Sequence, residues 1–560
     1  MAALAALALV AGLVVAARGG DDPARRTARD FAAAWERGDY VAMHGLLSPK
    51  ARRRTSARRL ARTYTRAAET ATVQRVVTGA PVAGEDGGYT VPVRLQTRIF
   101  GELRGRVRLP VSDAGDEEDA RPGVDWTARM AFPGLRRGEQ LSRETSVAER
   151  ADVLARDGTP LAGGPDRVSE LGPLAAEIAG RLGPIPEDRA DAYARLGIPE
   201  GTNVGLNGLE REFDERLIGR PGGTLRAGER VVAQVEPRRG SDVRTSIDPT
   251  IQGAAVEALA GRFGGVAVMR PKTGEVLGLA GVAFSAPQPP GSTFKIITLA
   301  GALEAGTVKR SATFPKETAT TLEGVELENA NGEVCGGSLS FSFAESCNSV
   351  FAPMGAELGA ERLVRAAKRF GFNERPSIRG AAPSTIPEAA EIGDDLAVGS
   401  TAIGQGRVLA TPLQMASIAA TIAEDGRRVL PSLLRGGGAS RSVRATTPEV
   451  ARTVSRYMRR VVTDGTGTAA AIPGVKVAGK TGTAELRDTT ADPATGLDLP
   501  PGEQPAADTT DTDAWFTAFA PAGEPRIAVA VLLVGQGAGG ETAAPAAKQV
   551  LQAALKAGGR

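Results

Sequence analysis

Histidine and cysteine are the two scarcest chemically useful residues in this chain. Among 560 residues there is one histidine, His44, and there are two cysteines, Cys335 and Cys347. One histidine nearly excludes a Ser-His-Asp triad and any site with several histidine metal ligands. Two cysteines are too few for a four-sulfur zinc site or an iron–sulfur cluster. We therefore expect no metal and no cofactor, and we expect His44 to be an ordinary polar group of the fold.

An excess of charge of one sign is also lacking. The chain has 68 basic and 65 acidic residues, which gives a net charge of +3. This balance argues against a nucleic-acid-binding protein and against an acidic disordered tail. The length exceeds what one core accommodates, so about two to four domains are expected.

A long apolar run occurs at the start of the chain. Residues 2–17 are all apolar or glycine, and Arg18 follows them. The run is slightly short for a spanning helix, and no basic residue precedes it. We expect residues 1–20 to be a retained single-pass anchor in the cell membrane; a cleaved signal peptide is the alternative, because residues 15–17 are small enough for cleavage. Either way, the rest of the protein is expected to be extracytoplasmic.

Two folded parts are expected before the middle of the chain. Residues 24–137 predict an α+β cone, because helical spacing at 28–47 precedes strand-like alternation around residues 89–109, and Trp126 marks a last strand. Residues 138–240 are rich in charges and in Gly/Pro breaks, and predict an extended pedestal or dimerisation-type domain.

Residues 241–560 predict a third, larger domain in which a sheet is flanked by helices. The fold class expected for the whole chain is therefore multidomain α+β. The predicted strands lie at 265–269, 276–280, 514–520 and 527–534, with helices at 249–259 and 544–555.

Ser292 and Lys295 are the first candidate catalytic residues. Two prolines and a glycine stop the chain just before Ser292, and the apolar run that follows predicts a buried helix. The hydroxyl would lie in the first turn, where free N–H groups favour developing negative charge. Lys295 is one turn further along the same face, and burial would lower its pKa so that it can accept a proton, which arginine cannot do. Taken alone, Ser-x-x-Lys is short and usually marks only a capped core helix.

Two further short motifs follow downstream. Ser346-Cys347-Asn348 falls at a helical segment, and Lys480-Thr481-Gly482-Thr483 lies on a strand expected to begin near Val475. The order Ser-x-x-Lys, Ser-x-Asn and Lys-Thr-Gly, at separations of about 50 and 130 residues, is that of penicillin-recognising enzymes.

The joint match resembles a class B penicillin-binding protein, a monofunctional peptidoglycan D,D-transpeptidase. Similar segments extend over nearly the whole chain after residue 20, and the first domain resembles the nuclear-transport-factor-like domain found in some of these proteins. The segments that carry this resemblance are Gly208-Leu209-Glu210, Ser246-Ile247-Asp248, Ile403-Gly404-Gln405-Gly406, Ala514-Trp515-Phe516 and Phe132-Pro133-Gly134-Leu135. The resemblance places Gln405 and Gly406 near the site, although a structural turn is an equal alternative.

The resemblance implies a role for each catalytic candidate. Neutral Lys295 takes the proton of Ser292, which attacks a D-Ala-D-Ala stem peptide. Backbone N–H groups of Ser292 and Thr483 hold the oxyanion. Ser346, helped by Lys480, relays a proton to the departing amine.

The remaining motif residues are implied to bind substrate. Asn348 can bind both the N–H and the C=O of the peptide, while Thr481 and Thr483 suit its terminal carboxylate. Gly482 lets the substrate backbone pair against the strand. The expected partners are stem peptides, β-lactams that acylate the serine, the membrane, and a polytopic glycosyltransferase; nucleic acid is not expected.

Two structural expectations accompany this reading. Cys335 and Cys347 lie twelve residues apart in an exported domain, so a disulfide beside the second motif is expected, with free buried cysteines as the alternative. Residues 488–513 are rich in Asp, Thr and Pro and predict a mobile loop beside the site.

Other functions remain open at this point. A D,D-carboxypeptidase differs only in using water as acceptor, and a serine β-lactamase shares the three motifs but needs a base and water for fast deacylation. A non-catalytic cell-wall scaffold or β-lactam sensor is the alternative outside the enzymes, and it would not need Lys295 and Lys480.

Overall fold

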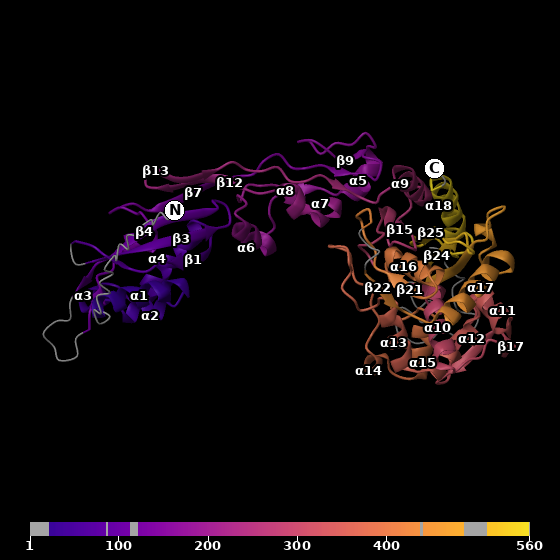
Figure 1. Ribbon diagram of the computed structural model, residues 1–560. Helices are drawn as coiled ribbons and strands as arrows, with labels where there is room; N and C mark the ends of the chain where they lie inside the picture. The colour runs from indigo at the N-terminus through magenta and orange to yellow at the C-terminus, as the bar shows by residue number, and fades with distance from the viewer. Residues whose placement is uncertain (1–21, 86–87, 113–120, 437–440, 486–511, 559–560) are drawn as a thin grey trace, which may run out of the picture. The chain divides into compact units, whose positions relative to one another are not determined.

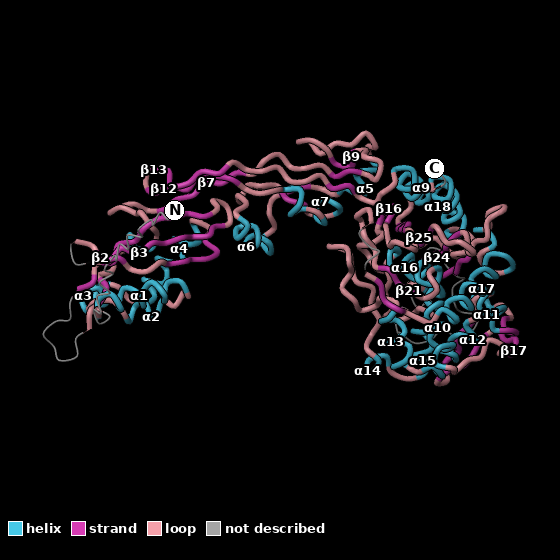
Figure 2. The backbone as a smooth tube through the Cα atoms, viewed as in Figure 1, coloured by secondary structure: helices cyan, strands magenta, loops and turns pink. Residues whose placement is uncertain are grey.

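The computed structural model describes residues 22–85, 88–112, 121–436, 441–485 and 512–558 (Figure 1). The apolar run at 2–17 lies outside this part, as does all but the end of the predicted loop at 488–513. Within the described residues, no helix combines the length and apolar character needed to cross a bilayer. Figure 2 shows helices and strands mixed throughout the chain, as the predicted fold class requires.

Contacts within the chain define two compact units, each assembled from separate stretches. Unit 1 comprises residues 1–148, 184–202 and 219–239, and unit 2 comprises 149–183, 203–218 and 240–560. The sequence-based division at residues 137 and 240 stays a prediction.

Unit 1 packs four helices against an antiparallel sheet. Strand β3 pairs with β1, β2 and β4, and its residues alternate between buried and exposed, so the odd-numbered side chains from Tyr89 to Thr97 face the helices. Aromatic rings fill the core, with Trp35 and Trp126 both packing on Tyr64. The elements are α1 (Pro23–Glu36), α2 (Tyr40–Gly45), α3 (Pro49–Arg54), α4 (Ala57–Thr70), β1 (Val73–Thr78), β2 (Val82–Ala83), β3 (Tyr89–Thr97), β4 (Glu102–Leu109), β5 (Val111–Ser112) and β6 (Gly123–Val124).

One sequence prediction for this unit is wrong. Trp126 does not lie in a strand; it follows β6 and precedes the 3-10 turn η1 (Ala128–Ala131). Its ring is buried because it completes the aromatic core, which a loop residue can do as well as a strand residue. His44, as expected, is a satisfied polar group, with its Nε2 2.8 Å from the carbonyl of Thr55.

The rest of unit 1 comes from later stretches of the chain. Strands β7 (Leu141–Ser146), β12 (Gly222–Ala227) and β13 (Arg230–Val235) form an antiparallel sheet in the order β13-β12-β7, and helix α6 (Glu187–Leu196) ends at Gly197 in a left-handed conformation.

Unit 2 begins with short elements around a buried charge cluster. Arg150 lies 2.7 Å from both Glu210 and Asp214, and Arg167 lies 2.6 Å from Glu210. Both acids are almost wholly buried, so each needs its cation to offset lost hydration. The elements here are β8 (Val153–Leu154), β9 (Pro160–Ala162), α5 (Pro173–Ala179), β10 (Leu182–Gly183), β11 (Val204–Gly205), α7 (Gly208–Glu212), α8 (Asp214–Ile218) and β14 (Val243–Arg244).

A five-stranded antiparallel sheet in the order β16-β15-β25-β24-β23 organises the remainder of unit 2. Helices α9 and α18 cover one face with an alanine- and valine-rich core, and α10 and α16 lie in the core on the other face. The predicted strands and terminal helices are confirmed to within a few residues: α9 (Pro249–Leu259), β15 (Gly264–Met269), β16 (Val276–Gly281), β23 (Ala478–Glu485), β24 (Thr512–Ala520), β25 (Ile527–Leu533) and α18 (Ala543–Ala557).

A largely helical region lies between β16 and β23 in sequence. It contains α10 (Lys295–Ala305), α11 (Leu339–Ala344), α12 (Asn348–Leu358), α13 (Ala360–Arg369), α14 (Ala389–Ile392), α15 (Asp395–Ala402), α16 (Pro412–Ala423) and α17 (Pro448–Asp464). Short strands connect them: β17 (Thr313–Glu317), β18 (Ala319–Leu322), β19 (Val325–Glu328), β20 (Cys335–Ser338), β21 (Arg427–Val429) and β22 (Ser442–Arg444).

Candidate active site

Ser292 lies in a 3-10 turn, η2 (Gly291–Phe294), that leads directly into α10. The turn is held against the sheet at Gly291, which has a φ of +51° and no space for a side chain, since a Cβ there would lie 2.5 Å from the Thr483 carbonyl. Its N–H donates to the Gly404 carbonyl at 3.0 Å. The candidate nucleophile is therefore fixed between β23 and the segment at residue 404, at the half-exposed start of a buried helix.

Lys295 is fully buried behind this turn, and three hydrogen bonds hold its Nζ. It donates to the Ser346 carbonyl at 2.7 Å, to Asn348 Oδ1 at 2.6 Å and to Ser346 Oγ at 3.4 Å. Burial, and secondly the nearby charge of Lys480, lower its pKa well below the usual 10.5. Among the described residues no hydrogen bond joins Lys295 to Ser292. The structure thus adds a link to the second motif that the sequence did not predict.

Ser346 lies at the bend between α11 and α12, with a φ of +63°. Its hydroxyl accepts a hydrogen bond from Lys480 Nζ at 2.8 Å. Lys480 is fully buried on β23, and burial lowers its pKa to about 7, opposed by the charge of Glu345. A hydroxyl therefore lies between two amines that are each easier to deprotonate than an ordinary lysine.

Asn348 opens helix α12 and has capacity left for a ligand. Its Oδ1 accepts from Lys295, and its Nδ2 donates to the Glu328 carbonyl at 2.7 Å. A carboxamide carries two N–H donors and two acceptor lone pairs, so one donor and one acceptor remain.

The strand β23 brings the third motif beside Ser292. Thr481 Oγ1 lies 2.6 Å from Thr466 Oγ1, and Thr483 Oγ1 accepts from the Gly539 N–H at 3.4 Å. A Cβ on Gly482 would lie 2.8 Å from the Pro290 carbonyl, so the packing of the protein itself requires glycine there.

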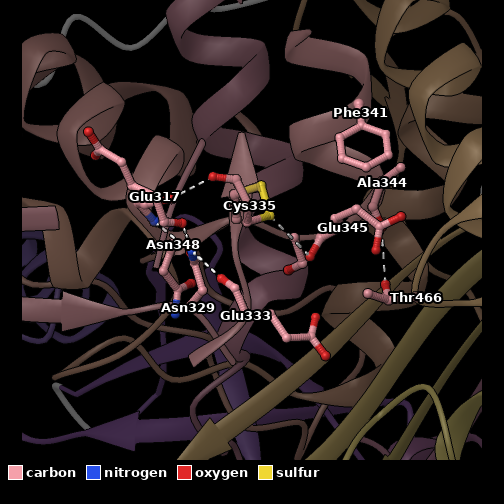
Figure 3. The surroundings of a disulfide bond; sticks show 12 residues. Glu317, Asn329, Glu333, Cys335, Phe341, Ala344, Glu345, Asn348 and Thr466 are labelled. Atoms are coloured by element: carbon pink, nitrogen blue, oxygen red, sulfur yellow. Dashed lines mark hydrogen bonds between the residues drawn. A yellow bond between two sulfur atoms is a disulfide. The ribbon is translucent and has the colours of Figure 1, made fainter. Parts of the chain in front are cut away.

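Cys335 and Cys347 form a disulfide that joins β20 to the second motif, with a Cα–Cα distance of 5.4 Å. Asn348 and Asn329 lie on one side of this bond, and Glu345 and Thr466 lie on the other (Figure 3). The Ser346 bend is therefore covalently tied to its neighbouring strand.

Three features of the site were not found in the sequence. Glu345 adjoins Ser346, and its pKa is raised mainly by burial and then by the charges of Glu333 and Asp464. Thr466 bonds to the third motif from a loop with no motif of its own. Phenylalanine rings lie 5.6 Å from each buried amine, Phe351 from Lys295 and Phe343 from Lys480. The position of Glu345 next to Ser346 in sequence was a signal that could have identified it. The Thr466 contact and the phenylalanine rings depend on tertiary packing.

Gln405 and Gly406 were placed near the site by resemblance alone. Their neighbour Gly404 does contact the Ser292 turn, while the Gln405 N–H donates to the Ser400 carbonyl at 3.0 Å. The described residues contain no cluster of three His, Cys, Asp or Glu side chains able to hold a metal.

Two family models match the chain. Residues 264–552 match the penicillin binding protein transpeptidase domain, and residues 158–245 match the penicillin-binding protein dimerisation domain.

Individual relatives agree with these matches. The peptidoglycan D,D-transpeptidase PbpA of Mycolicibacterium smegmatis is 33% identical over 433 residues, covering 65% of this chain and 81% of the relative. Among solved structures, the D,D-transpeptidase domain of a peptidoglycan glycosyltransferase from Eggerthella lenta is similar with a TM-score of 0.59 and 27% identity, covering 74% of this chain and all of that one. The imipenem acyl-enzyme of penicillin-binding protein A from M. tuberculosis is similar with a TM-score of 0.55 and 27% identity, covering 73% and 99%.

Proposed function

This chain belongs to the penicillin-binding protein transpeptidase family, and we propose that it is a D,D-transpeptidase that cross-links peptidoglycan stem peptides through an acyl-enzyme on Ser292. The support is the family match over residues 264–552, together with relatives named peptidoglycan D,D-transpeptidases. β-Lactams would acylate the same serine, as the imipenem acyl-enzyme of the M. tuberculosis relative illustrates for that protein.

One observation carries the assignment of residues within the site. Lysines from the first and third motifs both bond to the hydroxyl of the second, at 3.4 Å from Lys295 and 2.8 Å from Lys480. Residues 295, 346 and 480 are far apart in sequence, so this convergence is a property of the fold. A site that served only packing would not need two buried amines, because each costs hydration that aliphatic side chains would not lose.

In the acylation step, the Ser292 Oγ attacks the carbonyl of the terminal D-Ala-D-Ala bond while its proton passes to neutral Lys295. A neutral amine suits this task, because two N–H bonds satisfy the Ser346 and Asn348 acceptors and leave a lone pair for the proton. The backbone N–H groups of Ser292 and Thr483 would stabilise the oxyanion. The close contact of Gly291 with the Thr483 carbonyl keeps these two backbone segments together.

Collapse of the tetrahedral intermediate breaks the C–N bond and forms a serine ester. The departing D-alanine amine takes a proton from Ser346, which regains one from Lys480 or Lys295. In the second half-reaction, the amine of another stem peptide attacks the ester carbonyl, loses a proton to the same groups and releases Ser292 as the free hydroxyl.

Substrate would be oriented by polar groups of the second and third motifs. Asn348 offers its unused donor and acceptor to the peptide backbone, and Thr481 and Thr483 bind the terminal carboxylate near the charge of Lys480. β23 is the last strand of the five-stranded sheet, so its outer edge could pair with an extended peptide.

Two proposals concern the remainder of the chain. Residues 24–137 would be a nuclear-transport-factor-like domain. The support for this proposal is that helices pack on an antiparallel sheet around an aromatic core. Residues 1–20 would anchor the protein in the membrane, where a polytopic glycosyltransferase would supply glycan strands.

Labelling with a fluorescent penicillin tests the proposed function. Wild type should form a stable adduct and Ser292→Ala should form none, while Ser285→Ala, at an exposed serine on the same approach to the turn, should label normally. Adduct on a folded Ser292→Ala protein would contradict the assignment. Rapid penicillin hydrolysis by wild type would indicate a β-lactamase, and release of D-alanine without cross-linked product would indicate a carboxypeptidase.

A further inference from the structure

Helices α3 and α4 of unit 1 carry a basic surface that the proposed chemistry does not use. Residues 49–66 contain eight basic residues, Lys50 and seven arginines, and no acidic residue. All eight side chains are exposed. We call these residues the α3–α4 basic surface.

These cations have no acidic partners in the part of the chain that the structure describes, whereas surface arginines such as Arg104, Arg230 and Arg310 each form an ion pair. Within α4, Arg58, Arg62 and Arg66 follow one another at a spacing of four residues, which places like charges side by side and destabilises the helix. The helix is kept in place from its other face, where Leu60, Tyr64 and Ala67 are buried. An external anion is therefore the natural partner of the exposed face.

The start of α3 lies beside the first turns of α1, where the chain enters unit 1 from its apolar run. The Thr27 hydroxyl lies in the first turns of α1 and donates to the Pro122 carbonyl at 3.2 Å. Ser48 caps the start of α3, and its N–H donates to the Val124 carbonyl at 3.0 Å. Helices α1 and α3 therefore both begin beside residues 122–125. The entry point is itself fixed, because the Tyr89 hydroxyl donates to the Asp22 carboxylate. Five residues separate position 17 from α1, and they span at most about 17 Å.

We propose that the α3–α4 basic surface binds the anionic phospholipid headgroups of the membrane that holds residues 2–17. Guanidinium groups bind phosphate bidentately, and basic residues within a Debye length of an anionic bilayer are attracted to it. The short tether keeps unit 1 beside the bilayer, so the effective concentration of lipid phosphate at the basic surface exceeds that of a freely diffusing polyanion. The inference depends on the proposed anchor and is independent of the chemistry at Ser292.

The test uses the full chain in lipid nanodiscs. Thr65→Cys, an exposed α4 position, is labelled with a fluorophore, which is specific because both native cysteines are in the disulfide. Quenching by headgroup-labelled lipid should be several-fold stronger in bilayers with anionic lipid than in zwitterionic ones, and high salt should remove the difference. Arg58→Gln/Arg59→Gln/Arg62→Gln should reduce the anionic-lipid-dependent quenching at least tenfold, since each cation contributes a severalfold gain in binding.

A matched variant separates this surface from net charge. Arg94→Gln/Arg104→Gln/Arg106→Gln removes three exposed arginines from the sheet strands β3 and β4 and should leave the quenching unchanged. Equal loss in both variants, or no dependence on anionic lipid, overturns the proposal. A probe response to soluble polyphosphate in zwitterionic discs, without one to anionic lipid, assigns the surface to a soluble or wall polymer instead. A chain that fails to enter either disc while still binding penicillin removes the anchor, and with it this inference alone.

Discussion

The Nζ of Lys480 and the hydroxyl of Ser346 lie 2.8 Å apart, although 134 residues separate them in sequence. The amine is wholly buried and the hydroxyl is half-exposed, so a proton can pass from the interior to a ligand through Ser346.

Lys295→Arg should slow acylation strongly, although it keeps a long basic side chain at this position. Arginine stays protonated and cannot accept the Ser292 proton, so the acylation rate by penicillin should fall by about 10² to 10⁴-fold. Stopped-flow labelling measures the rate, and Lys476→Arg, at an exposed lysine, is the matched control. Near-normal acylation by a folded Lys295→Arg protein would show that Lys295 is not the base.

Ser346→Ala and Ser346→Gly should differ in stability but not in activity. Both remove the hydroxyl, so both should acylate much more slowly. The φ of +63° at this position disfavours alanine and suits glycine, so the alanine variant should be less stable than the glycine variant by about 1 kcal/mol. Urea unfolding measures the difference, and equal stabilities would show that the bend relaxes on substitution.

Glu345 should determine the pH at which kcat/KM falls on the alkaline side of the pH–rate profile. The pKa of Lys480 is about 7, and Glu345 holds it above where burial alone would place it. If the ammonium form supplies the proton, kcat/KM should fall as the pH rises through this value. Glu345→Gln should move the falling limb to lower pH, and Glu345→Asp should largely restore it. A limb that does not move in Glu345→Gln would exclude Lys480 as the titrating group.

Removal of the disulfide should destabilise unit 2. Cys335→Ala/Cys347→Ala opens a loop closed over 12 residues, which corresponds to about 3 kcal/mol of unfolding free energy in the chain-entropy model. Penicillin acylation should also slow, because Ser346 and Asn348 flank Cys347. Wild type unfolded in the presence of a reductant should match the variant, and the variant should not respond to reductant.

Asp513 should make stability depend on pH independently of the catalytic groups. This buried carboxyl accepts one bond from the Gly535 N–H at 3.1 Å, its Oδ2 has no partner among the described residues, and burial raises its pKa to about 6. Because the folded pKa lies above the unfolded value of 3.8, its stabilising contribution is complete below about pH 4 and is lost as the pH rises to about 6. The loss is at most about 3 kcal/mol, and solvent screening of the partly buried carboxylate makes it smaller.

Asp513→Asn should remove this slope, since asparagine can keep the Gly535 bond without a charge. Unfolding free energies at pH 4, 5, 6 and 7 measure it. An unchanged slope in the variant would assign the pH dependence to other groups.

The sequence predicted the sheet of unit 2 well because its strands are continuous apolar runs bounded by turns. The start of α9 at Pro249 was also predicted, and the structure adds that the Asp248 side chain caps this helix. The order of the motifs predicted that Ser292, Ser346 and Lys480 share one site. The structure places all three motifs side by side.

The details that sequence did not yield all depend on long-range contacts. Glu210 is buried against Arg150, which lies 60 residues away in sequence, and the local pattern of charges gives no sign of this burial. The link from Lys295 to Ser346 depends on a left-handed bend at a serine, which no propensity favours. Gly482 appeared to make room for substrate, whereas its immediate contact is Pro290.

The division of the chain into interleaved stretches has a consequence for its biogenesis. The polypeptide crosses between the two units five times, at positions 148, 183, 202, 218 and 239, so neither unit is a continuous segment. No single cut releases one of them whole, and a nascent chain shorter than about 240 residues lacks strands that the first unit requires. Synthesis of the first 239 residues must therefore precede completion of either body, and a fragment that ends at residue 137 would lack β7, β12 and β13, whose Leu141, Leu225 and Val232 pack on the core of the first unit.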